Sequence, residues 1–229
     1  LAPWQSLMTG LGVNTKKTAR FTTVSGLWDA TLKGKVVLLT ELRDTVGLVM
    51  LGNGADPSMP TRATFDAAIK TLEDAIASEQ VRKLSGQGYT ELLINDAAYA
   101  AIAWSGDVGI IQADKPELEF IVPDEGGMYA TDNMLIPKGA KNKYTAELWI
   151  DFYYQPEIAA VVEAYVQYIC PVKGAAEEIT KIDPALATNP LIFPDDETKK
   201  RLRVWGDVSA EDQAYFDEQF SAVVEGVGA

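Results

Sequence analysis

The sequence predicts an α/β fold, in which short strands alternate with amphipathic helices around a mainly parallel sheet. Short apolar runs such as residues 36–39 are rich in β-branched residues, as expected for buried strands. Elsewhere, apolar residues recur at helical spacing, most clearly over residues 64–77. The chain has 229 residues, 47% of them apolar, which is enough for one large domain or two small ones.

The first half of the chain supplies most of the predicted sheet. Strands are expected at residues 6–15 (a strand or connector), 36–39, 99–104 and 119–122. Helices are expected at residues 43–51, 64–77 and 107–113. Gly52 and Gly54 end the first of these helices, and Thr64 is the expected N-cap of the second.

The second half is predicted to be mostly helical. Helices are expected at residues 143–154, 156–164 and 195–203, followed by a final helix after Ser209. Pro156 suits the first turn of its helix, and Ser209 with Glu211 is a typical N-terminal signal. The final helix has an apolar face that includes Phe216 and Phe220.

Charge and composition exclude several kinds of function. The formal net charge of −13 argues against nucleic-acid binding, which needs a basic face. Histidine is absent, which removes Ser-His-Asp and Cys-His catalysis and most transition-metal sites. The single cysteine, Cys170, excludes an internal disulfide and a thiolate cluster, and a buried apolar role is expected for it. We therefore predict no metal and no cofactor.

Two segments pair an aromatic residue with an acidic one. Trp104 stands three residues before Asp107, and Tyr129 stands three residues before Asp132. Each pair follows an apolar, strand-like run. An aromatic face attracts positive charge and a carboxylate accepts N–H hydrogen bonds, so such pairs suit an organic cation.

Several segments, in order along nearly the whole chain, resemble the polyamine-binding proteins, which are extracytoplasmic solute receptors of bacterial ABC importers for spermidine and putrescine. They are residues 27–29 (Leu-Trp-Asp), 32–48, 103–107 (Ala-Trp-Ser-Gly-Asp), 123–127 (Pro-Asp-Glu-Gly-Gly), 136–143 and 155–159. The resemblance implies a type II periplasmic-binding-protein-like fold of two α/β lobes with the ligand between them. It also implies a location outside the cytoplasm, either periplasmic or as a surface lipoprotein of a Gram-positive bacterium.

By this resemblance the chain holds mostly lobe two, with lobe one incomplete. Residues 1–12 would be a remnant of lobe one or a crossover, and residues 13–130 the main part of lobe two. Residues 131–178 would return to lobe one, and residues 179–229 would complete lobe two. The chain opens at Leu1 like a trimmed or processed end. We therefore expect a missing N-terminal segment, or another chain, to cover the helices at 143–154 and 156–164.

The resemblance also implies a set of ligand-binding residues. Trp104 matches an aromatic that packs against the polyamine, Asp132 matches an acid that receives an amine, and Tyr168 matches a cleft tyrosine. Leu42 and Thr45 stand where the spermidine receptors carry acids.

Two neighbouring acids can substitute for the missing ones, because Glu41 and Asp44 each lie one residue earlier. A second departure is Ala130, which stands where many receptors carry a second tryptophan, and Tyr129 beside it is a candidate replacement. A third is Gly206, which replaces a side chain that contacts ligand in the family.

We therefore expect a non-enzymatic receptor that delivers a polyamine to a membrane permease of an ABC transporter. A receptor of the same fold for an amino acid, a phosphonate or a metal chelate is the nearest alternative. A hydrolytic enzyme using the paired carboxylates of Asp124 and Glu125 is more distant, since these acids lie in a turn where solvated carboxylates are usual.

Overall fold

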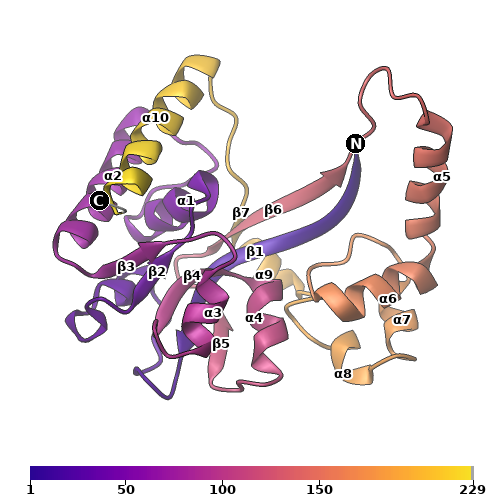
Figure 1. Cartoon of the computed structure of the whole chain (residues 1–229), viewed down its shortest axis with the longest axis horizontal. Coiled ribbons are helices and arrows are strands. Elements are labelled where there is room, and N and C mark those ends of the chain that lie inside the picture. The colour runs from indigo at the N-terminus through magenta and orange to yellow at the C-terminus, as the bar shows by residue number, and fades with distance from the viewer. Residues whose placement is uncertain (228–229) are drawn as a thin grey trace.

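A mixed β-sheet crosses the molecule in the computed structural model, which describes residues 1–227 (Figure 1). The strands are β1 Ala2–Asn14, β2 Val36–Leu38, β3 Val81–Leu84, β4 Ala100–Trp104, β5 Leu118–Ile121, β6 Gly127–Met134 and β7 Leu202–Arg203. Their order is β3-β2-β4-β1-β6-β7, and β5 also pairs with β1. The first strand is therefore the centre of the sheet.

Helices cover the sheet and extend beyond it. They are α1 Leu42–Gly52, α2 Arg62–Ala77, α3 Tyr89–Ile94, α4 Ser105–Gln112, α5 Lys143–Tyr153, α6 Pro156–Val166, α7 Ala175–Ile179, α8 Pro184–Ala187, α9 Asp196–Lys200 and α10 Ala210–Gly226. Two short 3-10 helices, Val24–Trp28 and Ala30–Leu32, precede β2. We call the sheet with α1–α4 and α10 the sheet lobe, and α5–α8 the helical segment.

The prediction of a mainly parallel sheet is wrong. Strand β2 runs parallel to β3 and β4, and β6 runs parallel to β7. Strand β1, however, is antiparallel to β4, β5 and β6. It is long enough to pair with β6 along its first half and with β4 and β5 along its second. An apolar run predicts a buried strand but not its direction, so the sequence pattern missed this.

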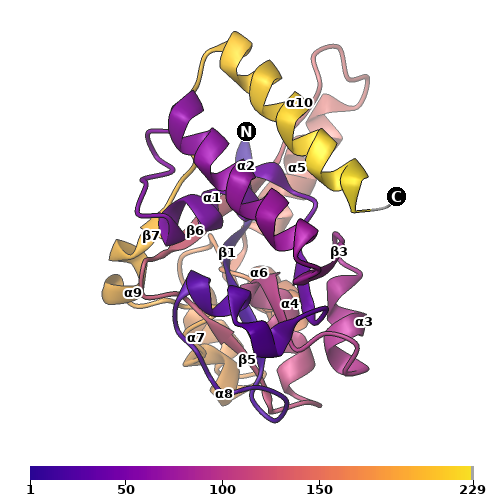
Figure 2. The same ribbon diagram turned by 90° about the vertical axis from the view of Figure 1, so that its left-hand side faces the viewer.

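The sheet lobe has a closed hydrophobic core. Helices α2 and α10 lie side by side over α1 (Figures 1 and 2). Phe65 of α2 stacks on Phe216 of α10 with 4.1 Å between ring centroids and 12° between ring planes, and neither ring is exposed. Stacked rings of this kind add to the burial of their area. The predicted apolar face of the final helix is confirmed.

The start of β1 and the end of β6 pair with each other and extend from the sheet toward the helical segment (Figure 1). The helical segment has only a small core, made by Tyr153, Ala159, Val172 and Ala175. The predicted lobe boundaries at 12/13 and 130/131 fall inside β1 and β6, and α8 still packs on α7 beyond the boundary at 178/179. The division into lobes stays a prediction.

Two helix assignments need correction. The N-cap of α2 is Thr61, whose side chain accepts the Thr64 N–H at 3.2 Å, while Thr64 Oγ1 accepts the Thr61 N–H at 3.0 Å. The pair forms a capping box, so Thr64 is its second member and not the cap. The helix predicted at 195–203 ends at Lys200, because Leu202–Arg203 pairs with β6 as β7.

Candidate functional site

A cleft of about 380 Å³ lies beside the ribbon of β1 and β6. Its lining comes from β1, the start of α1, the junction of β4 with α4, β6, and the end of α6. These residues are Trp4, Gln5, Leu7, Glu41, Asp44, Gln87, Trp104, Ala130, Asp132, Val166 and Tyr168. The cleft brings together five of the six residues predicted from the sequence, which come from distant parts of the chain.

Trp104 forms one wall of the cleft. It is the last residue of β4 and the N-cap of α4, so its position follows from the strand-to-helix turn. Its indole packs edge-on against the buried ring of Tyr89, with centroids 6.1 Å apart and an interplanar angle of 75°. The indole Nε1 is buried and has no hydrogen-bond partner within the described part of the chain. The wall therefore offers an unused donor as well as an apolar face.

Tyr168 reaches the cleft through a turn. Helix α6 ends at Val166, and its C-cap Gln167 takes the left-handed conformation with φ 53° and ψ 31°, which redirects the chain. The Tyr168 hydroxyl donates to Asp107 Oδ1 at 2.6 Å, and the Tyr89 hydroxyl donates to Asp107 Oδ2 at 3.0 Å. With its hydroxyl engaged, Tyr168 presents its ring to the cleft.

Gly106 makes room for that ring. A Cβ atom at position 106 would lie 2.6 Å from Cδ2 of Tyr168, which is closer than real contacts allow. Burial is the main reason that the pKa of Tyr168 is raised, and the neighbouring Asp107 raises it further. Tyr168 is therefore a neutral aromatic wall at physiological pH.

Three carboxylates face the cleft: Glu41, Asp44 and Asp132. Asp44 accepts a short hydrogen bond from Thr9 Oγ1 of β1. Burial raises the pKa of Asp44, with Glu41 and Asp132 raising it further, against the lowering effects of the Thr9 hydrogen bond and of the Trp104 indole. The indole lowers this pKa from nearby, although its Nε1 forms no hydrogen bond with any of the described residues.

The other two carboxylates have free acceptor capacity. Glu41 Oε2 is buried without a hydrogen-bond partner in the described structure, while Oε1 accepts from Thr40 Oγ1 at 3.2 Å. Asp132 is exposed and stands opposite Gln5 in the β1–β6 pair. Among the described residues, the cleft lining holds no lysine or arginine. Such a lining suits a cation, because carboxylates accept its N–H groups and ring faces pack on its carbon chain.

Tyr129, the sixth predicted residue, does not line this cleft. Side chains alternate along β6, so Tyr129 points away from the side that Ala130 and Asp132 share. It lines a neighbouring groove with Arg43, Thr131 and Trp205.

Sequence reasoning missed several residues of the cleft wall, including Trp4, Gln5 and Gln87. Gln5 belongs to the site because β1 pairs with β6, and no local signal near the start of the chain indicates that pairing. Asp107 and Gly106 were part of the recognised motif, but their support of Tyr168 needs the tertiary structure.

Asp124 and Glu125, the paired acids considered for a hydrolytic enzyme, accept hydrogen bonds from residues 22–24. Asp124 Oδ2 accepts from Thr22 Oγ1 at 2.6 Å, and Glu125 Oε1 accepts from the Val24 N–H at 3.2 Å. Neither residue lines the cleft. Within residues 1–227, no group of three or more histidine, cysteine or acidic side chains is placed to hold a metal ion.

Residues 1–194 match the family model of bacterial extracellular solute-binding proteins. This chain belongs to that family. The resemblance to extracytoplasmic solute receptors seen in the sequence is therefore confirmed at the level of this family. In the described structure, no helix combines the length and the apolar character needed to cross a membrane.

Individual relatives agree with this assignment. The spermidine/putrescine-binding periplasmic protein of Escherichia coli is 22% identical over 212 residues, which cover 93% of this chain and 60% of that protein. The spermidine/putrescine-binding periplasmic protein 1 of Haemophilus influenzae is 27% identical over 211 residues, covering 90% of this chain and 56% of that protein. The chain thus spans about 60% of the length of these relatives.

A solved structure shows the same fold. A Listeria monocytogenes protein, provisionally described as a spermidine/putrescine ABC transporter, superposes with a TM-score of 0.88 at 26% identity. The alignment covers 97% of this chain and 68% of that one. The predicted periplasmic-binding-protein-like α/β fold, present in part, is confirmed.

Proposed function

We propose that this protein is an extracytoplasmic receptor that binds a polyamine, such as putrescine or spermidine, and delivers it to an ABC permease without altering it. The observation that carries the proposal is one cleft lined by three carboxylates, by the rings of Trp104 and Tyr168, and by no basic side chain among the described residues. The names of the relatives support it, since several are spermidine/putrescine-binding periplasmic proteins.

The proposed roles follow from the cleft chemistry. Asp132, Asp44 and Glu41 would accept N–H hydrogen bonds from the ammonium groups, because a buried ammonium needs a paired carboxylate. Trp104 and Tyr168 would pack on the methylene chain between them. Ligand contacts to both sides of the cleft would bias a hinge equilibrium toward a closed form, which a permease can recognise.

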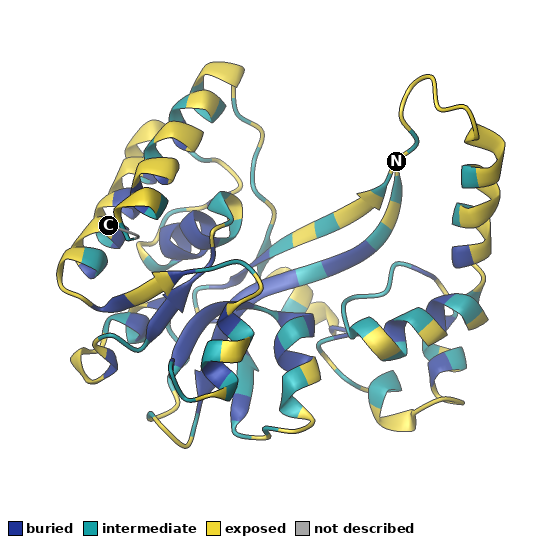
Figure 3. Ribbon diagram, in the orientation of Figure 1, coloured by how far each residue is buried: buried dark blue, intermediate teal, exposed yellow. Residues whose placement is uncertain are grey.

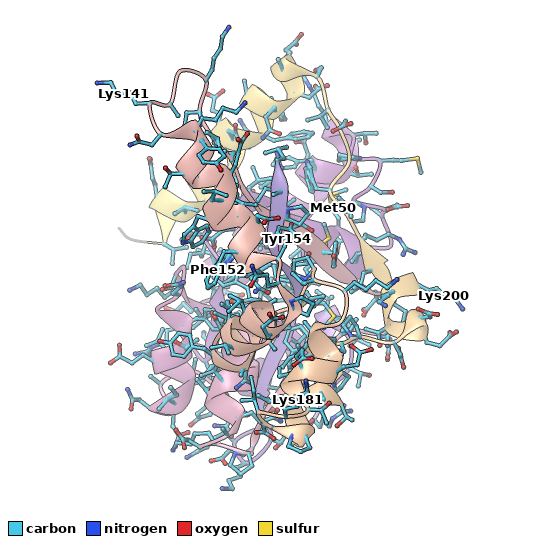
Figure 4. All side chains as sticks on the ribbon, turned by 90° about the vertical axis from the view of Figure 1, so that its right-hand side faces the viewer. Met50, Lys141, Phe152, Tyr154, Lys181 and Lys200 are labelled. Carbon is cyan, nitrogen blue, oxygen red and sulfur yellow. The ribbon has the colours of Figure 1, made fainter. Side chains whose placement is uncertain are left out.

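A further polypeptide is proposed to cover the helical segment, either an N-terminal segment of a longer chain or another chain. Its support is the large apolar side chains left in solvent on α5 and α6. Trp149 is 59% exposed, Phe152 51%, Val161 60% and Tyr165 83%. Figure 4 looks onto this region and labels Phe152 near the end of α5. Large exposed apolar patches usually mark interfaces.

Isothermal titration of the full-length natural protein with putrescine and spermidine tests the proposal. Asp132→Asn should weaken binding by about 2–5 kcal/mol, the range for a charge pair that is buried, as the pair would be once the cleft closes over the ligand. The matched control is Asp114→Asn, since Asp114 is exposed and outside the cleft. Unchanged putrescine affinity in Asp132→Asn would reject the assignment.

The same titration separates the alternatives. Binding of an amino acid, a phosphonate or a metal chelate in place of polyamines would indicate a receptor of the same fold with another ligand. Mass analysis of the ligand recovered after long incubation should return it unchanged. A new product would favour the enzyme alternative.

A further inference from the structure

A polar cluster lies directly behind the cleft wall and takes no part in the proposed binding. Glu163 of α6 is fully buried, with 0% exposure, and Gln5 of β1 is 2% exposed. The hydroxyl of Tyr153 and the thiol of Cys170 complete the cluster. Gln5 also lines the cleft, so whatever holds Gln5 shapes the site.

The hydrogen bonds of this cluster leave three acceptors unsatisfied. Gln5 Nε2 donates to the Tyr153 hydroxyl at 3.2 Å, and that hydroxyl donates to the Trp4 carbonyl at 2.5 Å. Gln5 Oε1 and both carboxyl oxygens of Glu163 are buried without hydrogen-bond partners in the described structure. A buried acceptor without a donor lowers the stability of the fold. A proton on one of these oxygens turns it into a donor, so that it and the acceptor it bonds are both satisfied.

The surroundings of Glu163 favour its neutral form. Burial raises the pKa of Glu163 to about 7, against smaller lowering effects from the Cys170 thiol, the Gln5 amide and the backbone near Tyr168. Cys170 is the other titratable group that acts on Glu163, and Glu163 in turn raises the pKa of Tyr153. Among the described residues, no lysine or arginine contributes to the shift of Glu163. Nothing in this set supplies a positive charge to pair with a carboxylate.

We propose that Glu163 is a positioning residue that, as a neutral acid, donates its O–H to Gln5 Oε1 and so fixes the Gln5 amide in the cleft wall. Gln5 stands opposite Asp132 in the β1–β6 pair, so the bond sets the group beside a proposed ammonium ligand. When Glu163 ionises, the donor is lost and the Gln5 amide has to turn its N–H toward the carboxylate. The cleft wall then changes with pH.

Nuclear magnetic resonance of the Gln5 side-chain amide, in the ligand-free full-length protein, tests this directly. Between about pH 5 and pH 9, the wild-type signals should show one transition near neutrality. Glu163→Gln should abolish the transition, because its amide donates at every pH. The matched control Glu157→Gln, an exposed position on the same helix, should keep it. Gln5 signals that do not titrate, or that titrate equally in Glu163→Gln, would overturn the proposal.

A second arm measures putrescine binding and rests on the proposed function. As pH rises through neutrality, wild-type affinity should fall relative to Glu163→Gln by roughly fivefold, the worth of one hydrogen bond. Glu163→Leu should show the weaker binding at every pH. A constant ratio between wild type and Glu163→Gln would contradict the positioning role. If no variant binds putrescine, the proposed function fails, while the amide titration still decides the role of Glu163.

Discussion

The sheet lobe and the helical segment use the same kind of helix with opposite results. In the sheet lobe, α2 and α10 bury Phe65 and Phe216 completely. In the helical segment, α5 buries only Tyr153 and leaves Trp149 and Phe152 more than half exposed. In Figure 3, α5 is exposed along most of its length. An apolar helix face is typical of an interface, but the sequence pattern does not say whether the same chain covers it.

The contrast predicts a large loss of stability from a truncation in the sheet lobe. Phe216→Ala should lower the free energy of unfolding by about 3–5 kcal/mol, because it removes a fully buried ring that stacks on Phe65. Urea unfolding should show a lower midpoint with an unchanged slope. A loss near zero would mean that the core is not packed as described.

The helical segment should gain stability from Glu163→Gln at alkaline pH. The folded-state pKa of Glu163 is raised from 4.5 to about 7, so the wild type loses stability as pH rises between these values. Above neutrality the variant should be more stable by up to roughly 3 kcal/mol, and below about pH 4.5 the two should match. Thermal unfolding across this pH range measures the difference. Parallel curves for the two proteins would place Glu163 in contact with water.

The junction between the two regions is sensitive to a single methyl group. Gly106→Ala should lower the free energy of unfolding by about 1–3 kcal/mol, the usual cost of overpacking, and should weaken putrescine binding because the Tyr168 ring is displaced. Titration calorimetry measures this effect. Gly226→Ala is the control, since a Cβ there meets nothing within 4 Å. Equal affinity in both variants would show that Tyr168 does not shape the cleft.

The smallest effect is expected on the exposed face of α5. Trp149→Ser in this 229-residue chain should change the free energy of unfolding by less than about 0.5 kcal/mol, because the side chain is 59% exposed. The same substitution in a full-length protein that covers this face should cost several times more. Urea unfolding of both forms makes the comparison. A cost similar to Phe216→Ala in the 229-residue chain would erase the contrast between the two regions.

Local signals in the sequence located most of the secondary structure. The capping of α10 by Ser209 and Pro156 at the start of α6 both appear as expected. The helix predicted at residues 195–203 is present but ends at Lys200, because Leu202–Arg203 pairs with β6 as β7. The predicted direction of the strands was wrong for the same reason, because pairing with β1 joins residues that are distant in the sequence.

The candidate site was predicted from a family pattern, and the structure tests only its geometry. Trp104, Asp132 and Tyr168 line one cleft with Glu41 and Asp44, so the resemblance placed them well. Their binding roles stay predictions. Tyr129 was misplaced, because one residue along a strand reverses the face to which a side chain belongs.

The sequence by itself determined that this is an acidic chain without histidine. Its local pattern predicted an α/β class, with carboxylates and aromatic rings at the ends of strands. Only the tertiary structure decided that β1 runs antiparallel through the middle of the sheet. It also decided that both carboxyl oxygens of Glu163 are buried without an observed hydrogen bond to any described residue. Local pattern is set by neighbours along the chain, which the sequence displays directly. Pairing and burial depend on contacts between distant residues, and one sequence alone does not reveal them.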